Sequence, residues 1–408
     1  MKTIVQKYGG TSVATVERIQ NVARRVIETK LKGYYPVIVV SAMGDATDQL
    51  IRLAKEINPN PSTREMDMLL STGEQTSIAL LAMAINALGY DAVSLTGSQC
   101  GIKTNDFYSK AKIDSIDTDR LLNELKNDRI VIVAGFQGAT LLGDITTLGR
   151  GGSDTTAVAL AVALDSVKCE IYTDVLGIYT TDPRIVTEAS LMSTISYDEL
   201  LEMAKLGAGV MHPRSVELAR KNKMPLIVRS AFDFSHDGTE IIEVSDMEKA
   251  QVRGVTLDED IARLSVPNVP DRPGIAYKLF SSLINLNVHI DMILQNLNHD
   301  GLNDISFTVP IDDLERILPT INAFVDEVGA SPIVVKKDVA KLSIIGTGIT
   351  SDVKIASGLF GKIYELGINI EMISTSEIKI SCIIDQSQAK KALTEVHNYF
   401  DLNGLISE

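Results

Sequence analysis

Residues 146–157, with the sequence TTLGRGGSDTTA, constrain the fold of this chain more than any other stretch. They follow an apolar run at 130–134 and lead into eight uncharged apolar residues at 157–164. This order predicts a strand, a glycine-rich loop and a helix, with Ser153 or Asp154 as the helix cap. Free N–H groups at a helix start favour anions, and the Arg150 guanidinium suits a carboxylate or a phosphate. Taken alone, the loop is better explained as a plain tight turn between a strand and a helix.

Length and charge narrow the class of protein. The 408 residues allow two or three domains, and a formal net charge of −14 argues against nucleic acid or an anionic membrane as the main partner. The three cysteines are far apart, which disfavours a zinc site or a disulfide framework and favours a reducing compartment. The start of the chain is too polar for a signal peptide, and no apolar run approaches eighteen residues. We therefore expect a cytoplasmic protein with no membrane-spanning segment.

The first 235 residues alternate between strand and helix patterns. Strands are expected at 4–7, 37–40, 92–95, 130–134, 169–173 and, last, 226–228. A helical pattern covers 13–27, and a long helix runs from about 64 to 88. This alternation predicts an α/β sheet with helices on both faces, followed by a linker at 236–250.

The last third of the chain contains an internal repeat. Residues 285–293 match 365–373 at an offset of 80 residues, and 263–266 match 341–344. In the first copy, residues 264–266, 276–286, 288–294, 305–309, 314–328 and 333–335 predict a ferredoxin-like β-α-β-β-α-β unit. The second copy lacks a last strand, and 252–257 form a spare strand. We therefore expect the first copy, 263–337, to be inserted in a second copy made of 251–262 and 338–408.

A second glycine-rich loop follows the first expected strand. Lys7 precedes Gly9 and Gly10, and both loops are expected at the carboxyl ends of strands, where such sheets bind ligands. Neither loop has the spacing of a Walker A motif or of a dinucleotide fingerprint. Two glycine loops with Lys7 and Arg150 predict a phosphate site.

With these motifs in place, the chain resembles the aspartate kinases of the amino-acid kinase superfamily, with a C-terminal ACT domain pair. The motifs that carry the resemblance are 7–12, 41–43, 72–74, 149–156, 172–175 and 180–184. The resemblance implies transfer of the γ-phosphoryl group of ATP to the side-chain carboxylate of L-aspartate, with Mg²⁺ bridging the phosphates and no protein residue assigned to the metal. It also implies that Lys7, Asp154 and Arg150 are catalytic.

The resemblance also assigns the substrate sites. Arg150 would hold the aspartate α-carboxylate, Glu74 its ammonium, and Ser41 and Thr47 would line the pocket. Without the resemblance, Glu74 would be read as an exposed helix carboxylate. The implied nucleotide residues are Lys7, Tyr8, Gly9, Gly10, Gly151, Gly152, Ser153, Thr173, Asp174, Tyr179, Thr180, Thr181, Asp182, Pro183, Arg184 and Lys205. Lys205 is included because many members carry a lysine where this chain has Gly209, and Lys205 lies one helical turn earlier.

The repeat resembles amino-acid-sensing ACT pairs. The implied effector residues are Asp271, Arg272, Pro273, Gly274, Ile275 and Ala276, which form a strand-to-helix turn, and Asp291, Gln295 and Asn296. Lysine, threonine or both are the expected inhibitors, and the sequence does not choose between them. A homo-oligomer through the ACT domains is expected. Met247 is a candidate internal start for a separate regulatory subunit, although a chance methionine is the favoured explanation.

Two alternatives stay open at this point. A kinase for another acidic acceptor, such as glutamate or carbamate, would use the same glycine loops, but the ACT pair and residues 72–74 weigh against it. A non-catalytic amino-acid sensor would have lost its chemistry, whereas Lys7, Arg150, Asp154 and Arg184 are all present.

Overall fold

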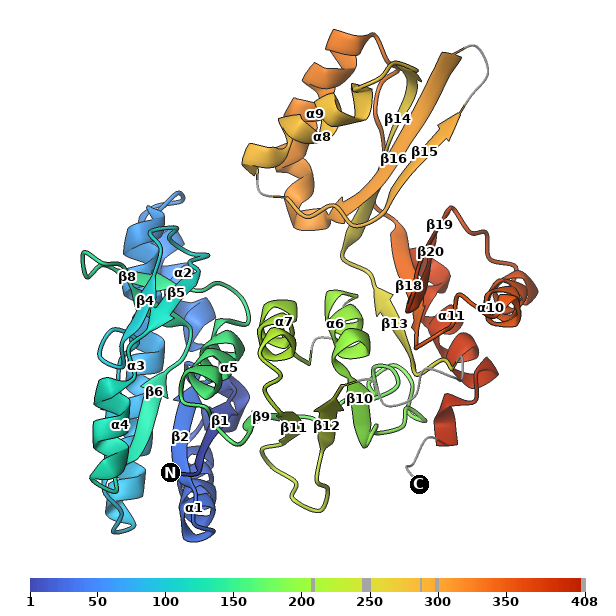
Figure 1. Ribbon diagram of the computed structural model, residues 1–408. Coiled ribbons are helices and arrows are strands. Elements are labelled where there is room, and N and C mark those ends of the chain that lie inside the picture. The colour runs from blue at the N-terminus through green and yellow to red at the C-terminus, as the bar shows by residue number, and fades with distance from the viewer. Residues whose placement is uncertain (207–209, 244–250, 287, 298–300, 405–408) are drawn as a thin grey trace.

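An eight-stranded, mostly parallel sheet organises the first part of the chain. The computed structural model describes residues 1–206, 210–243, 251–286, 288–297 and 301–404 (Figure 1). The strands of this sheet are, in spatial order, β10 (Thr194–Ser196), β12 (Thr239–Ile242), β11 (Leu226–Ser230), β9 (Cys169–Thr173), β1 (Thr3–Tyr8), β2 (Tyr35–Val40), β6 (Ile130–Ala134) and β3 (Ala92–Leu95). β1 lies between β9 and β2, parallel to both. The expected α/β class is confirmed.

Helices cover both faces of this sheet. One face packs against α1 (Val16–Leu31) and α3 (Thr63–Ala87), with α2 (Ala46–Ile57) beside α3. The other packs against α4 (Asp119–Lys126), α5 (Gly152–Ala163), α6 (Tyr197–Lys205) and α7 (Pro213–Lys221). Side chains of a strand alternate between faces, so Val5 points into the α5 side and Tyr8 into the α1 side. Lys7 therefore shares the α5 face with Val5.

The glycine-rich loop follows the last strand of a small second sheet. Its order is β5 (Ile113–Ile116), β4 (Ile102–Thr104), β7 (Gln137–Ala139) and β8 (Ile145–Thr147). The loop at 148–151 follows β8, so the expectation that it leaves the strand at 130–134 directly is wrong. Ser153 and Asp154 are not the helix cap either, because Gly151 takes that position with φ +66°. A Cβ on Gly151 would lie 2.1 Å from the Cβ of His212, so only glycine fits there.

The C-terminal part consists of two four-stranded sheets, each with two helices. The first has β15 (Ile293–Leu297), β16 (Leu302–Pro310), β14 (Ile261–Pro270) and β17 (Val334–Lys336), with α8 (Ile275–Ser282) and α9 (Leu314–Val328). The second has β13 (Gly254–Asp258), β18 (Val339–Ile345), β20 (Lys379–Asp385) and β19 (Met372–Ser376), with α10 (Val353–Glu365) and α11 (Gln386–Tyr399). β13 pairs with β18, although the whole first copy separates them in sequence. Short 3₁₀ helices occupy Gly10–Val13, Ile284–Leu286, Ile311–Asp313 and Leu402–Gly404.

Two expected boundaries are wrong. The strand expected last at 226–228 is followed by β12, which pairs antiparallel with β11, so residues 239–242 belong to the large sheet and not to a linker. Met247 lies outside the described residues. The strand expected at 288–294 begins only at Ile293. Met292, just before it, packs into a small core that both copies share.

The helix α3 is the one described helix long and apolar enough to cross a membrane, judged by length and composition. Half of its most apolar stretch is buried in the protein, and it carries the buried acidic residues Asp67 and Glu74. Its packing against α1 and β6 is that of a core helix.

Candidate functional site

The carboxyl ends of three neighbouring strands meet at one place. The Ser41 N–H after β2 donates to the Tyr8 carbonyl at 3.1 Å, and the Gly9 N–H donates to the Tyr172 carbonyl of β9 at 3.4 Å. A Cβ on Gly10 would lie 2.7 Å from the Ala42 carbonyl oxygen, so glycine is needed for this approach. The motifs at 7–12, 41–43 and 172–175 are therefore contiguous.

The two glycine loops are joined by an ion pair. Lys7 Nζ lies 2.6 Å from Asp154 Oδ1, and both side chains are largely buried. Asp154 and Ser153 lie in the first turn of α5, and Ser153 packs so closely on the end of β6 that a Cβ on Gly135 would lie 2.6 Å from its Oγ. A Cβ on Gly9 would lie 3.6 Å from Lys7 Nζ, so this ammonium stands directly beside the first loop.

Glu74 is buried, which corrects the reading of it as an exposed helix carboxylate. Its side chain accepts a hydrogen bond from the Ala42 N–H at 3.1 Å, while the other carboxylate oxygen has no partner among the described residues. Burial raises the pKa of Glu74 to about 7. Glu74 is buried because α3 closely approaches the end of β2, where a Cβ on Gly73 would lie 2.8 Å from the Ala42 side chain. The free oxygen is suited to an ammonium group.

Asp67 is a structural carboxylate that the sequence did not single out. It is fully buried and accepts hydrogen bonds from the Thr147 N–H (2.8 Å), the Thr147 hydroxyl (2.7 Å) and the Ser109 N–H (2.9 Å). Thr147 ends β8 three residues before Arg150. Asp67 also precedes Glu74 by two helical turns, so both carboxylates lie on the same side of α3. The only sequence signal was an acidic residue within an otherwise apolar stretch of helix.

The other residues expected to bind the substrate aspartate lie on the loop after β2 (Ser41), on α2 (Thr47) and on the loop after β8 (Arg150). Ser41 and Thr47 are half-buried, and Arg150 is exposed. No hydrogen bond or ion pair holds the Arg150 guanidinium within the described part of the chain. Arg214 steadies the loop instead, donating to the carbonyls of Leu148 (3.2 Å) and Ala111 (3.0 Å).

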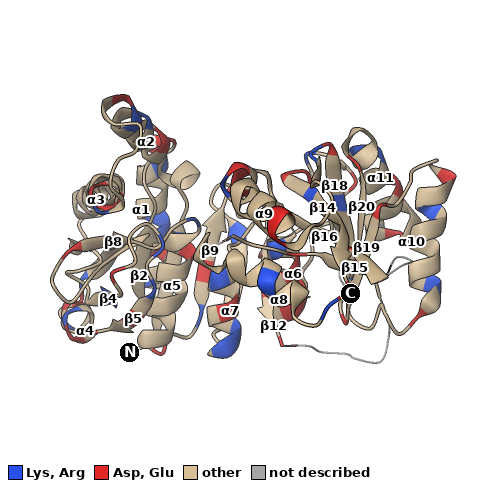
Figure 2. Cartoon of the chain, turned by 90° about the horizontal axis from the view of Figure 1, so that it is seen from above, with Lys and Arg blue, Asp and Glu red and all other residues tan. Residues whose placement is uncertain are grey.

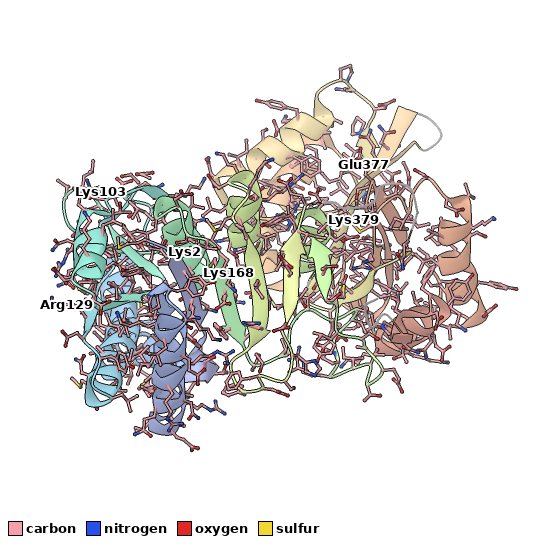
Figure 3. The ribbon with its side chains drawn as sticks, turned by 60° about the horizontal axis from the view of Figure 1, so that its bottom comes forward. Lys2, Lys103, Arg129, Lys168, Glu377 and Lys379 are labelled. Carbon is pink, nitrogen blue, oxygen red and sulfur yellow. The ribbon has the colours of Figure 1, made fainter. Side chains whose placement is uncertain are left out.

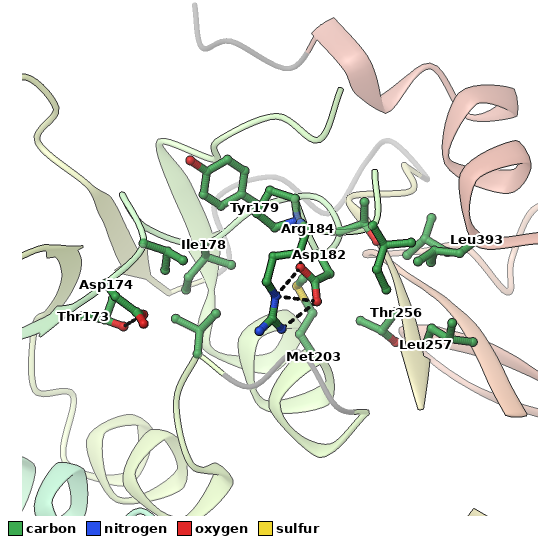
Figure 4. A pocket seen from close by; sticks show the side chains of 16 residues that line it. Thr173, Asp174, Ile178, Tyr179, Asp182, Arg184, Met203, Thr256, Leu257 and Leu393 are labelled. Atoms are coloured by element: carbon green, nitrogen blue, oxygen red, sulfur yellow. Dashed lines mark hydrogen bonds and ion pairs between the residues drawn. The ribbon is translucent and has the colours of Figure 1, made fainter. Parts of the chain in front are cut away.

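The expected nucleotide residues line a cavity of about 380 Å³ beyond the end of β9 (Figure 4). Those that line it are Thr173, Asp174, Tyr179, Thr181, Asp182, Pro183 and Arg184. Arg184 reaches Asp182 at 2.7 Å, and this contact lowers the pKa of Asp182. Tyr179 is partly buried, which raises the pKa of its hydroxyl.

Two expected nucleotide side chains lie elsewhere. Tyr8 is fully buried on the α1 side and stacks on Tyr172 with ring centroids 4.6 Å apart, so only its backbone can face a ligand. Thr180 is also fully buried, and its hydroxyl contacts the Ser190 N–H (3.0 Å) and His397 Nε2 (2.8 Å). Burial lowers the pKa of His397.

Lys205 ends α6 and pairs with Glu202 at 3.1 Å. Glu202 also pairs with Lys379 of β20 at 3.0 Å (Lys379 is labelled in Figure 3), so the carboxylate partner of Lys205 is shared with the second repeat copy. Gly209 lies outside the described residues.

The turn expected to bind the effector is formed, and the side chain of Asp271 within it already has a hydrogen-bond partner. Gly274 begins α8 with φ +88°, and Asp271 accepts a hydrogen bond from the Asn303 amide at 3.0 Å. Gln295 and Asn296 are exposed on β15. Arg272 and Pro273 are exposed, and Ile275 and Ala276 are half-buried at the start of α8.

Asp291, which is expected to bind an effector ammonium, pairs with Lys341 of β18 at 2.6 Å. Burial would raise the pKa of Asp291, but Lys341 outweighs burial and lowers it. Glu371, which corresponds to Asp291 in the second copy, makes the reciprocal pair with Arg263 of β14 at 2.9 Å. Each copy therefore places an acidic side chain against a basic side chain of the other copy, at equivalent positions.

Two further properties of the described residues are the distribution of their charges and their capacity to bind a metal ion. Figure 2 shows basic and acidic residues interspersed over the helices. Among the residues that the structure describes, no group of three or more His, Cys, Asp or Glu side chains is arranged to hold a metal ion.

Known proteins resemble this chain both in sequence and in fold. Residues 2–230 match the Amino acid kinase family, and residues 342–400 match an ACT domain. The chain is 48% identical over 403 residues to the aspartokinase of Geobacillus stearothermophilus, with 98% of each chain covered. The structure of E. coli aspartokinase III in complex with aspartate and ADP aligns with a TM-score of 0.83 at 25% identity, over 97% of this chain and 99% of that one. The same enzyme in complex with lysine and aspartate shares the fold, with a TM-score of 0.74 at 24% identity over 98% and 100%.

Proposed function

The chain belongs to the amino acid kinase family and is an aspartokinase. On that premise we propose that it transfers the γ-phosphoryl group of ATP to the side-chain carboxylate of L-aspartate and releases 4-phospho-L-aspartate. The contact of 2.6 Å between Lys7 and Asp154, where the two glycine loops meet, carries this proposal. An ammonium fixed beside loop N–H groups can neutralise the charge on a phosphoryl group during its transfer. The attacking carboxylate is already ionised at pH 7, so the reaction needs position and charge rather than a general base.

The acceptor site is proposed to be built on α3 and the loop after β8. The free Glu74 oxygen receives the aspartate ammonium, Arg150 pairs with the α-carboxylate, and Ser41 and Thr47 line the space between them. A zwitterionic amino acid matches one buried carboxylate opposite one guanidinium. This leaves the side-chain carboxylate to point at Lys7.

The nucleotide is proposed to bind along the cavity of Figure 4, with its phosphates towards Arg184, Lys7 and the N–H groups of Gly9, Gly10, Gly151 and Gly152. Mg²⁺ would arrive with the nucleotide. It would keep several waters and be held mainly by phosphate oxygens. The metal supplies charge neutralisation on the β- and γ-phosphates.

The regulatory part is proposed to consist of two ACT domains, one at 263–337 inserted in another at 251–262 plus 338–408, after a kinase domain that starts at residue 1. We propose that lysine, threonine or both inhibit the enzyme through these domains, and that they join chains into a homo-oligomer, with or without a separate regulatory subunit. The pairing of β13 with β18 supports the inserted arrangement. A cytoplasmic location and a first step towards lysine, threonine and methionine belong to the same proposal.

An acyl-phosphate trap tests the function. The protein is incubated with MgATP and hydroxylamine, with aspartate or glutamate as acceptor, and repeated with lysine and threonine. Hydroxamate from aspartate alone, suppressed by an added amino acid, is the expected result. Hydroxamate from glutamate would point to the other acceptor class, and ATP binding without hydroxamate from either acid would point to a sensor.

A further inference from the structure

The position of Arg150 depends on the loop that carries it rather than on contacts of its own side chain. Arg150 is exposed, and its guanidinium makes no hydrogen bond or ion pair among the described residues. Its neighbours Gly149 and Gly151 have φ angles of +79° and +66°, and glycine gives the backbone more freedom than any other residue. Contacts from outside the loop must therefore fix the place of Arg150.

The first turn of α7 supplies one such contact just before Arg150. Arg214, the second residue of this helix, donates from Nη1 to the Leu148 carbonyl at 3.2 Å and to the Ala111 carbonyl at 3.0 Å. Ala111 in turn donates its N–H to the Thr147 carbonyl at 2.9 Å. One guanidinium nitrogen therefore joins two chain segments where β8 ends, 66 and 103 residues away from it in sequence.

The same turn of α7 contacts the loop again just after Arg150. His212 is the N-cap of α7, and it lies so close to the loop that a Cβ on Gly151 would be 2.1 Å from the His212 Cβ. His212 Nδ1 accepts a hydrogen bond from the Arg214 N–H at 3.3 Å, and Pro213 between them fixes the backbone at the first helical position. Two side chains of one helical turn therefore bracket Arg150.

The environment of Arg214 indicates that its contribution is to this loop. Its side chain is half-buried, and burial lowers the pKa of Arg214. Among the described residues no carboxylate forms an ion pair with it, and both of its side-chain bonds go to backbone carbonyls. A partly buried charge without a counter-charge is costly, so these carbonyl bonds are what Arg214 gains in the folded chain.

We propose that Arg214 is a positioning residue for the acceptor: by holding Leu148, it places the Arg150 guanidinium where aspartate presents its α-carboxylate. The inference rests on the proposed function, because it takes Arg150 as the partner of that carboxylate. A guanidinium–carboxylate pair needs a defined distance and plane, so a loop free to shift by about 1 Å loses much of the contact. Without Arg214, recognition of the α-carboxylate weakens, while the ammonium contact at Glu74 is kept.

The test compares aspartate with β-alanine, which is aspartate without its α-carboxylate, on the full-length protein. Arg214→Met keeps most of the side-chain length and removes the donors, so calorimetric titration should show Kd for aspartate raised about tenfold. Kd for β-alanine, measured by competition against aspartate, should stay unchanged, because this ligand has no group for Arg150. Arg220→Met is the matched control and should change neither Kd, since Arg220 lies on the same helix but pairs with Asp198 at 2.8 Å.

A double-mutant cycle shows whether Arg214 acts through Arg150. Arg150→Met alone should raise Kd for aspartate more than Arg214→Met does, and combining the two should cause no further rise. Effects that multiply in the double variant would mean that Arg214 acts independently of Arg150. That result, or an unchanged Kd for aspartate in folded Arg214→Met, or a parallel rise for aspartate and β-alanine, overturns the inference.

Arg214→Lys keeps the inference falsifiable if Arg214→Met does not fold. Lysine retains the charge, but its ammonium ends one bond short of the Nη1 position, so Kd for aspartate should rise about threefold with β-alanine again unchanged. Wild-type affinity for aspartate in folded Arg214→Lys would contradict the role of Arg214. The proposed function stands in every case in which the unaltered protein gives hydroxamate from aspartate, whereas an unchanged Kd in Arg150→Met would overturn the proposed acceptor site itself.

Discussion

The two ends of the site are built in different ways. The proposed aspartate end rests on one helix: α3 carries Glu74, the proposed partner of the substrate ammonium, and Asp67, which ties α3 to β8 through hydrogen bonds with Thr147. The nucleotide end takes part of its wall from β13 and α11, which belong to the second repeat copy. A site of this design can keep its acceptor geometry fixed while regulation acts on the nucleotide. The experiments below separate the two ends.

The largest effect is expected where the two ends meet. Lys7→Ala removes the ammonium beside Asp154, and loss of one group that stabilises transition-state charge typically lowers kcat about a thousandfold. The hydroxamate assay at saturating aspartate and MgATP measures it. Lys2→Ala, an exposed lysine just before β1 (Figure 3), is the control and should keep wild-type kcat. A Lys7→Ala enzyme with near-normal kcat would remove the basis of the proposed function.

Glu74→Gln tests the aspartate end. Losing a charge-assisted contact with the substrate ammonium should raise KM for aspartate about a hundredfold and leave KM for ATP unchanged. Glu65→Gln, an exposed carboxylate on the same helix, is the control. A parallel rise in both KM values would show that the two ends are not separate.

The raised pKa of Glu74 adds a pH signature to this experiment. With the pKa of Glu74 at about 7, lowering the pH protonates it and removes its charge, so KM for aspartate should rise below about pH 7, by at most about tenfold per pH unit. The raised pKa also means that, without substrate, this group's stabilising contribution is complete below its unfolded pKa and is lost as the pH rises through about 7. Saturating MgATP isolates the effect on aspartate. A flat KM profile for the unaltered enzyme would contradict the role given to Glu74.

How far the sequence leads can be judged residue by residue. Alternating strands and helices and the 80-residue repeat predict the sheet and its two companions, and α9 has the predicted bounds, Leu314–Val328. Even the displacement of Tyr8 is implicit in the alternation of β1, since Lys7 and Tyr8 must point to opposite faces. Asp67 could not be found this way, because its partners Ser109 and Thr147 are 42 and 80 residues away in sequence. Glu74 needed the contact between Gly73 and Ala42, and the burial of Thr180 depends on His397, 217 residues later.

Asp67→Asn sharpens the claim that α3 fixes the acceptor geometry. Asparagine keeps one acceptor oxygen but replaces the other by an amide that cannot accept from Thr147, leaving buried donors unpaired at a cost of about 1–3 kcal/mol in the free energy of unfolding. Because β8 ends at Thr147, three residues before Arg150, KM for aspartate should rise about tenfold while KM for ATP stays the same. Thr147→Val, which removes one of these bonds, should shift KM in the same direction by less. Thermal unfolding together with both KM values distinguishes misplacement of the loop from a general loss of stability, which would leave the KM of the folded enzyme unaltered.

The smallest effect is expected at the nucleotide end, where the kinase part is fastened to the regulatory part. Thr180→Val removes the hydroxyl between Ser190 and His397 but keeps the Thr180 carbonyl bond to Val255, so the nucleotide segment stays in place with a weaker link to α11. The change in KM for ATP on adding the inhibitory amino acid should shrink about threefold, within the range measured for residues that carry coupling between sites. KM for aspartate should not move, with or without the effector. Ser381→Ala, in the same regulatory sheet but away from this junction, serves as the control. If Thr180→Val altered the aspartate KM, the regulatory part would act on both ends of the site and the separation drawn here between them would fail.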